Sequence, residues 1–298
     1  MKVNGTAFGR LIFDYYGIEL SEEEKEWFSF DGKELKGSIL SGDKRGEAIA
    51  LAVRHEDRAV SEIAFFNGSK ESEVAAVRSM LKEPLVSQKL TMDALHFKPL
   101  TLEPIHVAGG IYLVGLKKNQ KELLSEMKFC VEQLKPCFED NSEWEKGHGR
   151  WEQRSYFCYD IEGAYIDERW TKVGFKTLIK VERQRIVSKN PETENKNVQI
   201  AYFLSNMDVQ KEQDALELFH AVRKHWQVET ANYIRDCILA EDKLRCIDSR
   251  TNRTIALCRT LAIKLLDKSD IKNKAEQMDY FADDFRLCLN FLKSINFL

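Results

Sequence analysis

Apolar and polar residues repeat with different periods along the chain, and these periods predict where strands and helices lie. Five short apolar runs, rich in β-branched and aromatic residues, are typical of strands; they lie at 27–30, 47–53, 59–66, 86–92 and 111–116. A capped helical pattern begins at Ser69 and stops at Pro84, and a second helical stretch closes at Gly109 and Gly110. We predict three antiparallel strands followed by helix, strand, helix and strand, the signature of a mixed α/β sheet.

The pattern changes after Leu116. A charged amphipathic helix is predicted at 117–135 and a loop rich in charge and glycine at 139–154. Three β-rich runs then follow at 151–159, 177–186 and 198–204, with the polar tract 188–197 as an exposed hairpin loop. This antiparallel block interrupts the α/β alternation, so we interpret it as an insertion. From Val209 onward the chain is predicted helical, with segments at 220–245, 252–266 and 274–297.

These patterns predict four consecutive parts of the chain. They are a short helical segment at 1–25, the first part of an α/β core at 26–134, a β-rich insertion at 135–205 and a helical second part of the core at 206–298.

The stretch from His220 to Arg245 contains a polar stripe beside an apolar one. No Pro or Gly interrupts it, and we predict one helix. Residues four and seven apart share a helix face, which groups five polar positions: His225, Glu229, Asn232, Tyr233 and Asp236. A single Glu on such a helix is most often a solvated surface residue. Its meaning depends on whether other carboxylates converge on it.

Composition limits the classes of protein to consider. The 298 residues are 43% hydrophobic and 31% charged, enough apolar material for a full core. The formal net charge of −3 shows no basic excess, so contact with nucleic acid has to come from local patches. Seven cysteines without a C-x-x-C pair suit free thiols in a reduced compartment. No apolar run reaches a membrane span and no signal peptide is evident, which favours a cytoplasmic protein.

Two predicted strands are followed by an aspartate. Asp31 follows the first strand and Asp93 the fourth, and ligand sites of open α/β sheets gather at strand ends. Together with Glu229 these acids suit a two-metal phosphoryl-transfer site, since magnesium prefers oxygen ligands. The simpler alternatives are that Asp31 caps a turn before Gly32 and that Asp93 is the N-cap of the next helix.

Six segments carry a family resemblance. In chain order they are DGKELKGS, LTMDALHF, YLVGLKKNQKELL, EKGHGRWEQR, VERQR and RKHWQVETANYIRDCILAEDKLR. They resemble the H-repeat-associated (ISAs-type) family of DDE transposases of bacterial insertion sequences, from about Asn4 to Leu266. The resemblance implies an RNase H-like fold: a mixed five-stranded sheet flanked by helices, with a β-rich insertion before the last catalytic helix. It further implies metal-dependent DNA cleavage and strand transfer, with Asp31, Asp93 and Glu229 as catalytic Mg²⁺ ligands and Mn²⁺ as a substitute.

The resemblance also extends to polar residues around these acids. It implies DNA-contacting or site-supporting roles for Lys33, Lys36, Lys117, Lys118, Asn119, Gln120, His148, Arg150, Arg223 and His225. Lys36 stands where the family usually has Arg, and a solvated basic loop is the alternative for the segment around His148. Many transposases of the wider superfamily have a Lys seven residues after the Glu, where this chain has Asp236. That residue is a candidate supplementary acid or a partner for an Arg.

The expected partner is double-stranded DNA, at element ends and at the target, bound by a homodimer in the bacterial cytoplasm at the nucleoid. Family members usually carry a further helical N-terminal domain that helps to bind DNA ends, and we expect this chain to lack it. The alternative interpretation is a domesticated descendant, either a host nuclease or a non-catalytic DNA-binding or scaffold protein. Retention of all three acids favours the catalytic interpretation.

Overall fold

The computed structural model describes residues 9, 20–21, 23–39, 41–147, 149–186, 197–271 and 273–297. They pack as two compact units: residues 29–80 with 226–298 form the larger part of the first, and residues 20–28 with 81–225 form the second. The predicted helical segment at 1–25 lies largely outside the described residues, as do His148 and nearly all of the predicted hairpin loop at 188–197.

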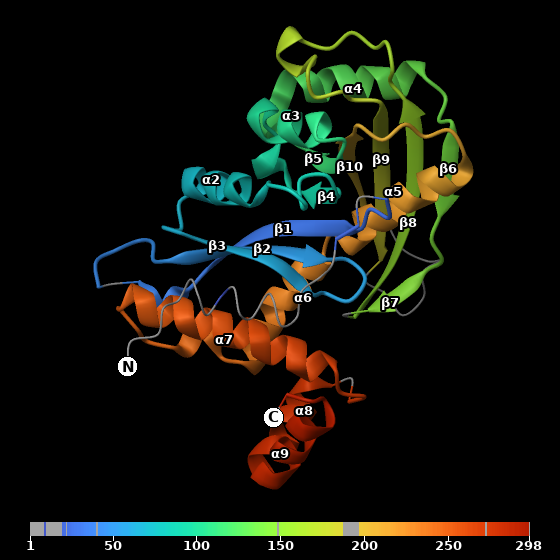
Figure 1. The fold of residues 1–298 in the computed structure, drawn as a ribbon. Coiled ribbons are helices and arrows are strands. Elements are labelled where there is room, and N and C mark those ends of the chain that lie inside the picture. Colours follow the sequence, from blue (N-terminus) through green and yellow to red (C-terminus); the bar gives the residue numbers. More distant parts are fainter. Residues whose placement is uncertain are drawn as a thin grey trace. The chain divides into compact units, whose positions relative to one another are not determined.

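The first unit combines three strands with helices from both ends of the chain (Figure 1). Its elements are β1 (Trp27–Glu34, from Ser29 on), η1 (Lys36–Ser38), β2 (Ala48–Arg54), β3 (Val60–Phe66), α2 (Lys70–Met80), α6 (Gln227–Tyr233), the π-helical turn η5 (Ile234–Ile238), η6 (Glu241–Lys243), α7 (Ser249–Asp267), α8 (Lys274–Asp283) and α9 (Phe285–Ser294). The strands lie in the order β3-β2-β1, and β2 and β3 are antiparallel. Six of the seven residues of β2 are buried, as expected of a central strand covered on both faces.

The core of this unit joins the strands to the C-terminal helices. Leu35, Ile49, Leu51 and Val53 pack against Val228 and Ala231 of α6 and Ala256 of α7. Figure 1 shows α7 on one side of the three strands and α2 on the other. Because side chains alternate along a strand, the residues of β1 with the parity of Leu35 face α6, among them Asp31 and Lys33.

The second unit holds the remaining strands. Its elements are β4 (Lys89–Met92), η2 (Ala94–His96), α3 (Pro99–Val107), β5 (Ile111–Leu116), η3 (Lys118–Gln120), α4 (Lys121–Gln133), β6 (Phe138–Asn141), β7 (Glu145–Gly147), β8 (Arg150–Asp160), η4 (Glu168–Trp170), β9 (Thr177–Ile186), β10 (Asn197–Ser205) and α5 (Glu212–Lys224). Its strands lie in the order β4-β5-β10-β9-β8-β6, with β7 also paired to β8. β4 and β5 are parallel, whereas β5 and β10, β10 and β9, β9 and β8, and β8 and β6 are antiparallel.

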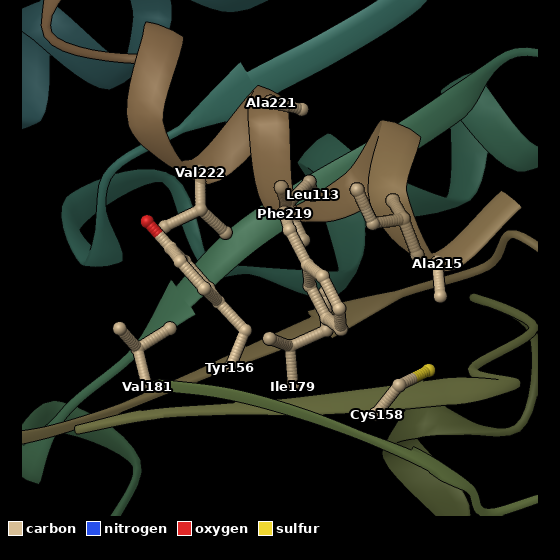
Figure 2. Close-up of a cluster of buried hydrophobic side chains, with 10 residues drawn as sticks. Leu113, Tyr156, Cys158, Ile179, Val181, Ala215, Phe219, Ala221 and Val222 are labelled. Carbon is tan, nitrogen blue, oxygen red and sulfur yellow. The ribbon is translucent and has the colours of Figure 1, made fainter. Parts of the chain in front are cut away.

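The predicted insertion continues the sheet. Its last strand, β10, pairs with β5 in register Tyr202↔Leu116 to Ser205↔Leu113, so the expected five-stranded sheet is too small: the described residues contain ten strands. The mixed α/β class is confirmed. α5 covers one face of the inserted strands, where its Ala215, Phe219 and Val222 meet Tyr156 and Ile179 (Figure 2).

Three predicted elements differ from the structure. The single helix at 220–245 is wrong, because α5 ends at Lys224, α6 passes into a π-turn that ends at Ile238, and Ala240 adopts a left-handed conformation with φ 50°. The loop predicted at 139–154 contains β6, β7 and the start of β8. The last predicted helix is interrupted at Asp284, which separates α8 from α9.

Two further findings concern the whole described chain. No helix among the described ranges combines the length and the apolar character needed to cross a bilayer. All seven cysteines are free thiols.

Candidate active site

Asp31 lies inside β1 rather than at its end, because the strand continues to Glu34. Its side chain faces α6, where Asn232 Nδ2 donates a hydrogen bond of 3.0 Å to Asp31 Oδ2. The other amide atom, Asn232 Oδ1, is buried and has no hydrogen-bond donor among the described residues. Asn232 therefore holds Asp31 through its Nδ2 atom, while its Oδ1 atom can still accept a hydrogen bond.

Glu229 lies on the same helix as Asn232, three residues earlier, and neighbours at this spacing have Cβ atoms about 5–6 Å apart on one helix face. Its side chain is largely exposed, and partial burial raises the pKa of its carboxyl. Asp31 and Glu229 are thus carried by facing elements of the first unit. Asp93, the third predicted acid, belongs to the second unit.

Asp236 forms an ion pair with Lys33. Lys33 Nζ lies 2.7 Å from Asp236 Oδ1, 3.2 Å from Glu241 Oε2 and 3.1 Å from Asp242 Oδ1, and only 7% of its side chain is exposed. Burial alone would lower the pKa of Lys33, but the hydrogen bonds to Asp236 and Asp242 and the charge of Glu241 outweigh it and raise the pKa. Asp236 is a partner for a cation, and that cation is a lysine.

Glu241 is shared among three cations: Arg235, Lys33 and, at 3.8 Å, Arg259. Arg235, whose side chain is 1% exposed, donates from Nε to Glu241 Oε2 and from Nη2 to Oε1, both at 2.9 Å. Burial raises the pKa of Glu241, but Arg235 and Lys33 more than offset this and hold the pKa below its usual range. This network ties the segment after Glu229 to β1, two residues beyond Asp31. Arg235, Glu241 and Asp242 had no predicted role, because only the fold brings them to Lys33.

Asp93 directly follows β4 in the second unit, as predicted. Its Oδ1 accepts a hydrogen bond of 2.7 Å from Leu95 N and so caps η2. Two predicted residues brace the same loop: Asn119 Nδ2 donates to Ala94 O at 2.6 Å and Gln120 Nε2 to Phe97 O at 3.0 Å. Asn119 and Gln120 therefore support the loop that carries Asp93.

His225 lies in the electrostatic neighbourhood of Asp93. Burial lowers the pKa of His225 to about 4, while the charge of Asp93 opposes this and those of His96 and Lys117 add to it. Its Nδ1 is 3.0 Å from Thr91 Oγ1, and the Thr91 hydroxyl in turn donates to Phe28 O at 3.3 Å. Because that hydroxyl has one proton, His225 Nδ1 donates to it. The lowered pKa of His225 keeps its imidazole neutral near pH 7.

The other predicted DNA-contacting residues occupy varied settings. Lys36 is 66% exposed and pairs with Asp242 at 2.7 Å, Arg150 pairs with Glu152 at 2.8 Å, and Arg223 pairs with Glu145. Lys117 and Lys118 are exposed at the end of β5. Nowhere in the described ranges do three or more His, Cys, Asp or Glu side chains form a group that could enclose a metal ion.

Fold and site define a mixed α/β protein with two carboxylates, Asp31 and Glu229, on facing elements of one unit and a third, Asp93, at a strand end of the other. No protein-family model matches the chain. The chain is 27% identical over 277 residues to a protein of Escherichia coli O157:H7 named "Putative transposase YncI"; the match covers 91% of this chain and 70% of that protein. This similarity over most of the chain supports a relationship to transposases.

Proposed function

We propose that the chain is a DDE transposase of the insertion-sequence type, which cleaves DNA at element ends and joins them to a target. The observation that carries the proposal is the similarity to a protein named as a transposase over 91% of the chain. Asp31, Asp93 and Glu229 are the proposed acids, in an RNase H-like fold. We further propose that it acts on double-stranded DNA as a homodimer, in the cytoplasm at the nucleoid.

The donor chemistry around Asp31 fits an oxygen-preferring divalent cation. Carboxylate and amide oxygens are the ligands that magnesium accepts in proteins. Partial burial raises the pKa of Glu229, because desolvation disfavours the charged carboxylate, and a bound cation would offset this cost. Asn232 Oδ1, buried and without a protein donor among the described residues, suits a hydrogen bond from water bound beside Asp31. Magnesium, or manganese in its place, would supply Lewis-acid chemistry for phosphoryl transfer.

The chain's own residues position these acids. Asn232 fixes the Asp31 carboxylate, while the Lys33–Asp236 pair anchors the π-turn that follows α6 to the same strand. Asn119 and Gln120 hold the loop after Asp93 by its carbonyl groups. Neutral His225 braces Thr91, two residues before Asp93, without adding a positive charge. Within each unit, an acid held in this way loses little orientational freedom when substrate binds.

The test replaces each acid by its isosteric amide. Asp93→Asn keeps an oxygen acceptor for Leu95 N, and Asp31→Asn keeps one for Asn232 Nδ2, so the fold contacts survive while the charge is lost. We expect each of Asp31→Asn, Asp93→Asn and Glu229→Gln to lose nicking of supercoiled DNA in Mg²⁺ or Mn²⁺. The loss should exceed the roughly 10- to 100-fold effect of removing a mere supporting partner.

Asp283→Asn provides the matched control, because Asp283 is an exposed aspartate at the end of α8. It removes the same charge and should leave nicking unchanged. Circular dichroism and thermal unfolding check that all variants fold. A wild-type protein that nicks DNA equally well in EDTA, or an Asp93→Asn variant as active as wild type, would refute the proposal.

A further inference from the structure

One face of the inserted strands is divided between an apolar half and a basic half. Residues paired directly across strands share a face, and the register pairs Tyr156 with Val181, Arg154 with Arg183, and Glu152 with Arg185. α5 covers the half that contains Tyr156 and Val181 (Figure 2). The arginines continue the same face beyond the end of that helix, at Lys224.

Three arginines of this basic half share a single carboxylate. Glu152 accepts hydrogen bonds from Arg150 Nε at 2.8 Å, Arg154 Nη2 at 2.8 Å and Arg185 Nε at 2.7 Å. The charges of Arg150 and Arg185 outweigh the effect of burial and lower the pKa of Glu152. One glutamate cannot neutralise this many guanidinium groups, so the cluster keeps an excess of positive charge.

A second carboxylate connects the cluster to the end of α5. Arg223, in the last turn of α5, pairs with Glu145, and Arg154 Nη1 lies 3.8 Å from the same Glu145 oxygen. Five arginines (Arg150, Arg154, Arg183, Arg185 and Arg223) against two glutamates (Glu145 and Glu152) give this group, here termed the arginine face, a formal charge of +3. The chain as a whole has a formal net charge of −3, so the arginine face is a region of positive charge on a negatively charged protein.

Arg183 is the member with the least compensation. Its Nη2 donates to the neutral amide of Gln199 at 2.5 Å, and no carboxylate within salt-bridge distance is found for it among the described residues. Burial and the neighbouring charges of Arg185 and Arg150 lower its pKa, although Glu152 opposes them. Within a positively charged cluster, a partly exposed arginine that lacks a carboxylate partner among the described residues favours an external anion.

We propose that the arginine face binds the phosphodiester backbone of double-stranded DNA. The inference rests on the proposed function for its choice of polyanion and adds a contact surface formed by Arg154, Arg183 and Arg185. Arginine forks match phosphate oxygens in two-point hydrogen bonds. At about 3.4 Å per strand residue, Arg150 and Arg154 are about 14 Å apart along β8. An array of that length suits successive phosphates better than one small anion.

Binding measured in EDTA separates this inference from the chemistry, because DNA cleavage by the proposed mechanism requires a divalent cation. The assay follows the fluorescence anisotropy of a labelled duplex as the protein is added at several salt concentrations. Arg183→Gln is the main variant, since it removes a charge without leaving a carboxylate unpaired. We expect it to weaken binding about tenfold, as for loss of one charge-assisted hydrogen-bonded contact, and to reduce the salt slope by about 1.

Controls separate binding from folding. Arg183→Gln relieves repulsion among like charges, so its thermal unfolding temperature should equal or exceed that of wild type, whereas a purely structural arginine would show the opposite. Arg183→Lys keeps the charge without the fork and should bind with intermediate affinity. Lys128→Gln, at an exposed position on α4, removes the same charge and should change affinity less than twofold.

Two outcomes would overturn the proposal: Arg183→Gln binds duplex as tightly as wild type, or inorganic phosphate displaces the duplex as well as unlabelled DNA does at equal phosphate concentration. The acid variants provide the distinction from the proposed function. Asp31→Asn should bind DNA like wild type in EDTA while failing to nick it in Mg²⁺. If Asp31→Asn nicks DNA as well as wild type and Arg183→Gln binds DNA weakly, the catalytic assignment is refuted but the proposal that the arginine face binds DNA is supported.

Discussion

Replacing Arg235 by Leu should destabilise the first unit strongly. The Arg235 guanidinium makes four hydrogen bonds inside the protein: two to Glu241, one of 2.8 Å to Thr260 Oγ1 and one of 2.9 Å to Ala256 O. Both Arg235 and Glu241 have side chains that are 1% exposed. Leucine would fill much of the volume but remove the hydrogen bonds of the closest cation. The buried Glu241 carboxylate would keep only Lys33, at 3.2 Å, and Arg259, at 3.8 Å, within salt-bridge distance among the described residues.

The expected cost follows from this burial. Removing one partner of a buried ion pair typically costs about 3–5 kcal/mol, because the other charge stays desolvated. That is a large part of the roughly 5–15 kcal/mol by which a domain is stable. The exposed pair Lys36–Asp242 provides the comparison, since Lys36 is 66% exposed. Lys36→Met should cost about 1 kcal/mol or less, because water solvates both charges once they separate.

Urea unfolding followed by circular dichroism measures the free energy of unfolding of each variant. Hydrogen exchange of peptides covering Ala231 to Leu239 reports the first unit locally, so that unfolding of the second unit does not mask the effect. The double variant Arg235→Leu, Glu241→Leu completes a thermodynamic cycle and should be more stable than Arg235→Leu alone, because it removes the stranded charge. Two results would refute this account of the buried pair: a cost below about 1 kcal/mol for Arg235→Leu, or a cost of the double variant equal to the sum of the costs of Arg235→Leu and Glu241→Leu.

Two further predictions concern stability. The pKa of His225 is about 4 in the folded protein, against an ordinary value of 6.5. As the pH falls, the unfolded chain therefore takes up a proton first, so stability is complete above about pH 6.5 and decreases as the pH drops toward 4. Between about pH 7.5 and 5 the loss of stability is about 2 kcal/mol. Urea midpoints at these two pH values should differ less in His225→Gln than in wild type, and an equal difference would contradict the assignment. Gly37→Ala would place a Cβ atom 1.5 Å from Leu244 O, which should cost about 1–3 kcal/mol in thermal unfolding. Gly147→Ala, with no atom within 4 Å of the added carbon, is its control and should leave the melting temperature nearly unchanged.

Local pattern predicted most of the strands, because their residue types and their burial agree. The runs that became β2, β3 and β5 are apolar and β-rich, and they match the observed strands within one or two residues. β6 and β7 escaped prediction since FEDN and EKG contain few β-formers. They are strands because β8 offers them hydrogen-bonding partners, which is information from the tertiary structure.

The polar stripe on the predicted helix shows the limit of spacing arguments. Two turns of α-helix separate positions seven apart, but the π-turn at Ile234–Ile238 changes the residue count per turn before Asp236 is reached. The left-handed Ala240 then ends the helical segment, although alanine is a strong helix former. No residue type in this segment marks either departure. The network around Lys33, which joins residues more than 200 positions apart, accounts for the geometry that the pattern missed.

The division of the chain has a consequence for its biosynthesis. Residues 81–225 supply nearly all of the second unit in one continuous piece, whereas the first unit needs residues 29–80 together with 226–298. As the chain leaves the ribosome from its N-terminus, β2 and β3 emerge well before α6 and α7. Until those helices are made, Leu35, Ile49, Leu51 and Val53 lack the covering side chains of Val228, Ala231 and Ala256. The first unit, whose strands are synthesised early, is therefore completed last. Its apolar strands are the surface that chaperones would have to protect until then.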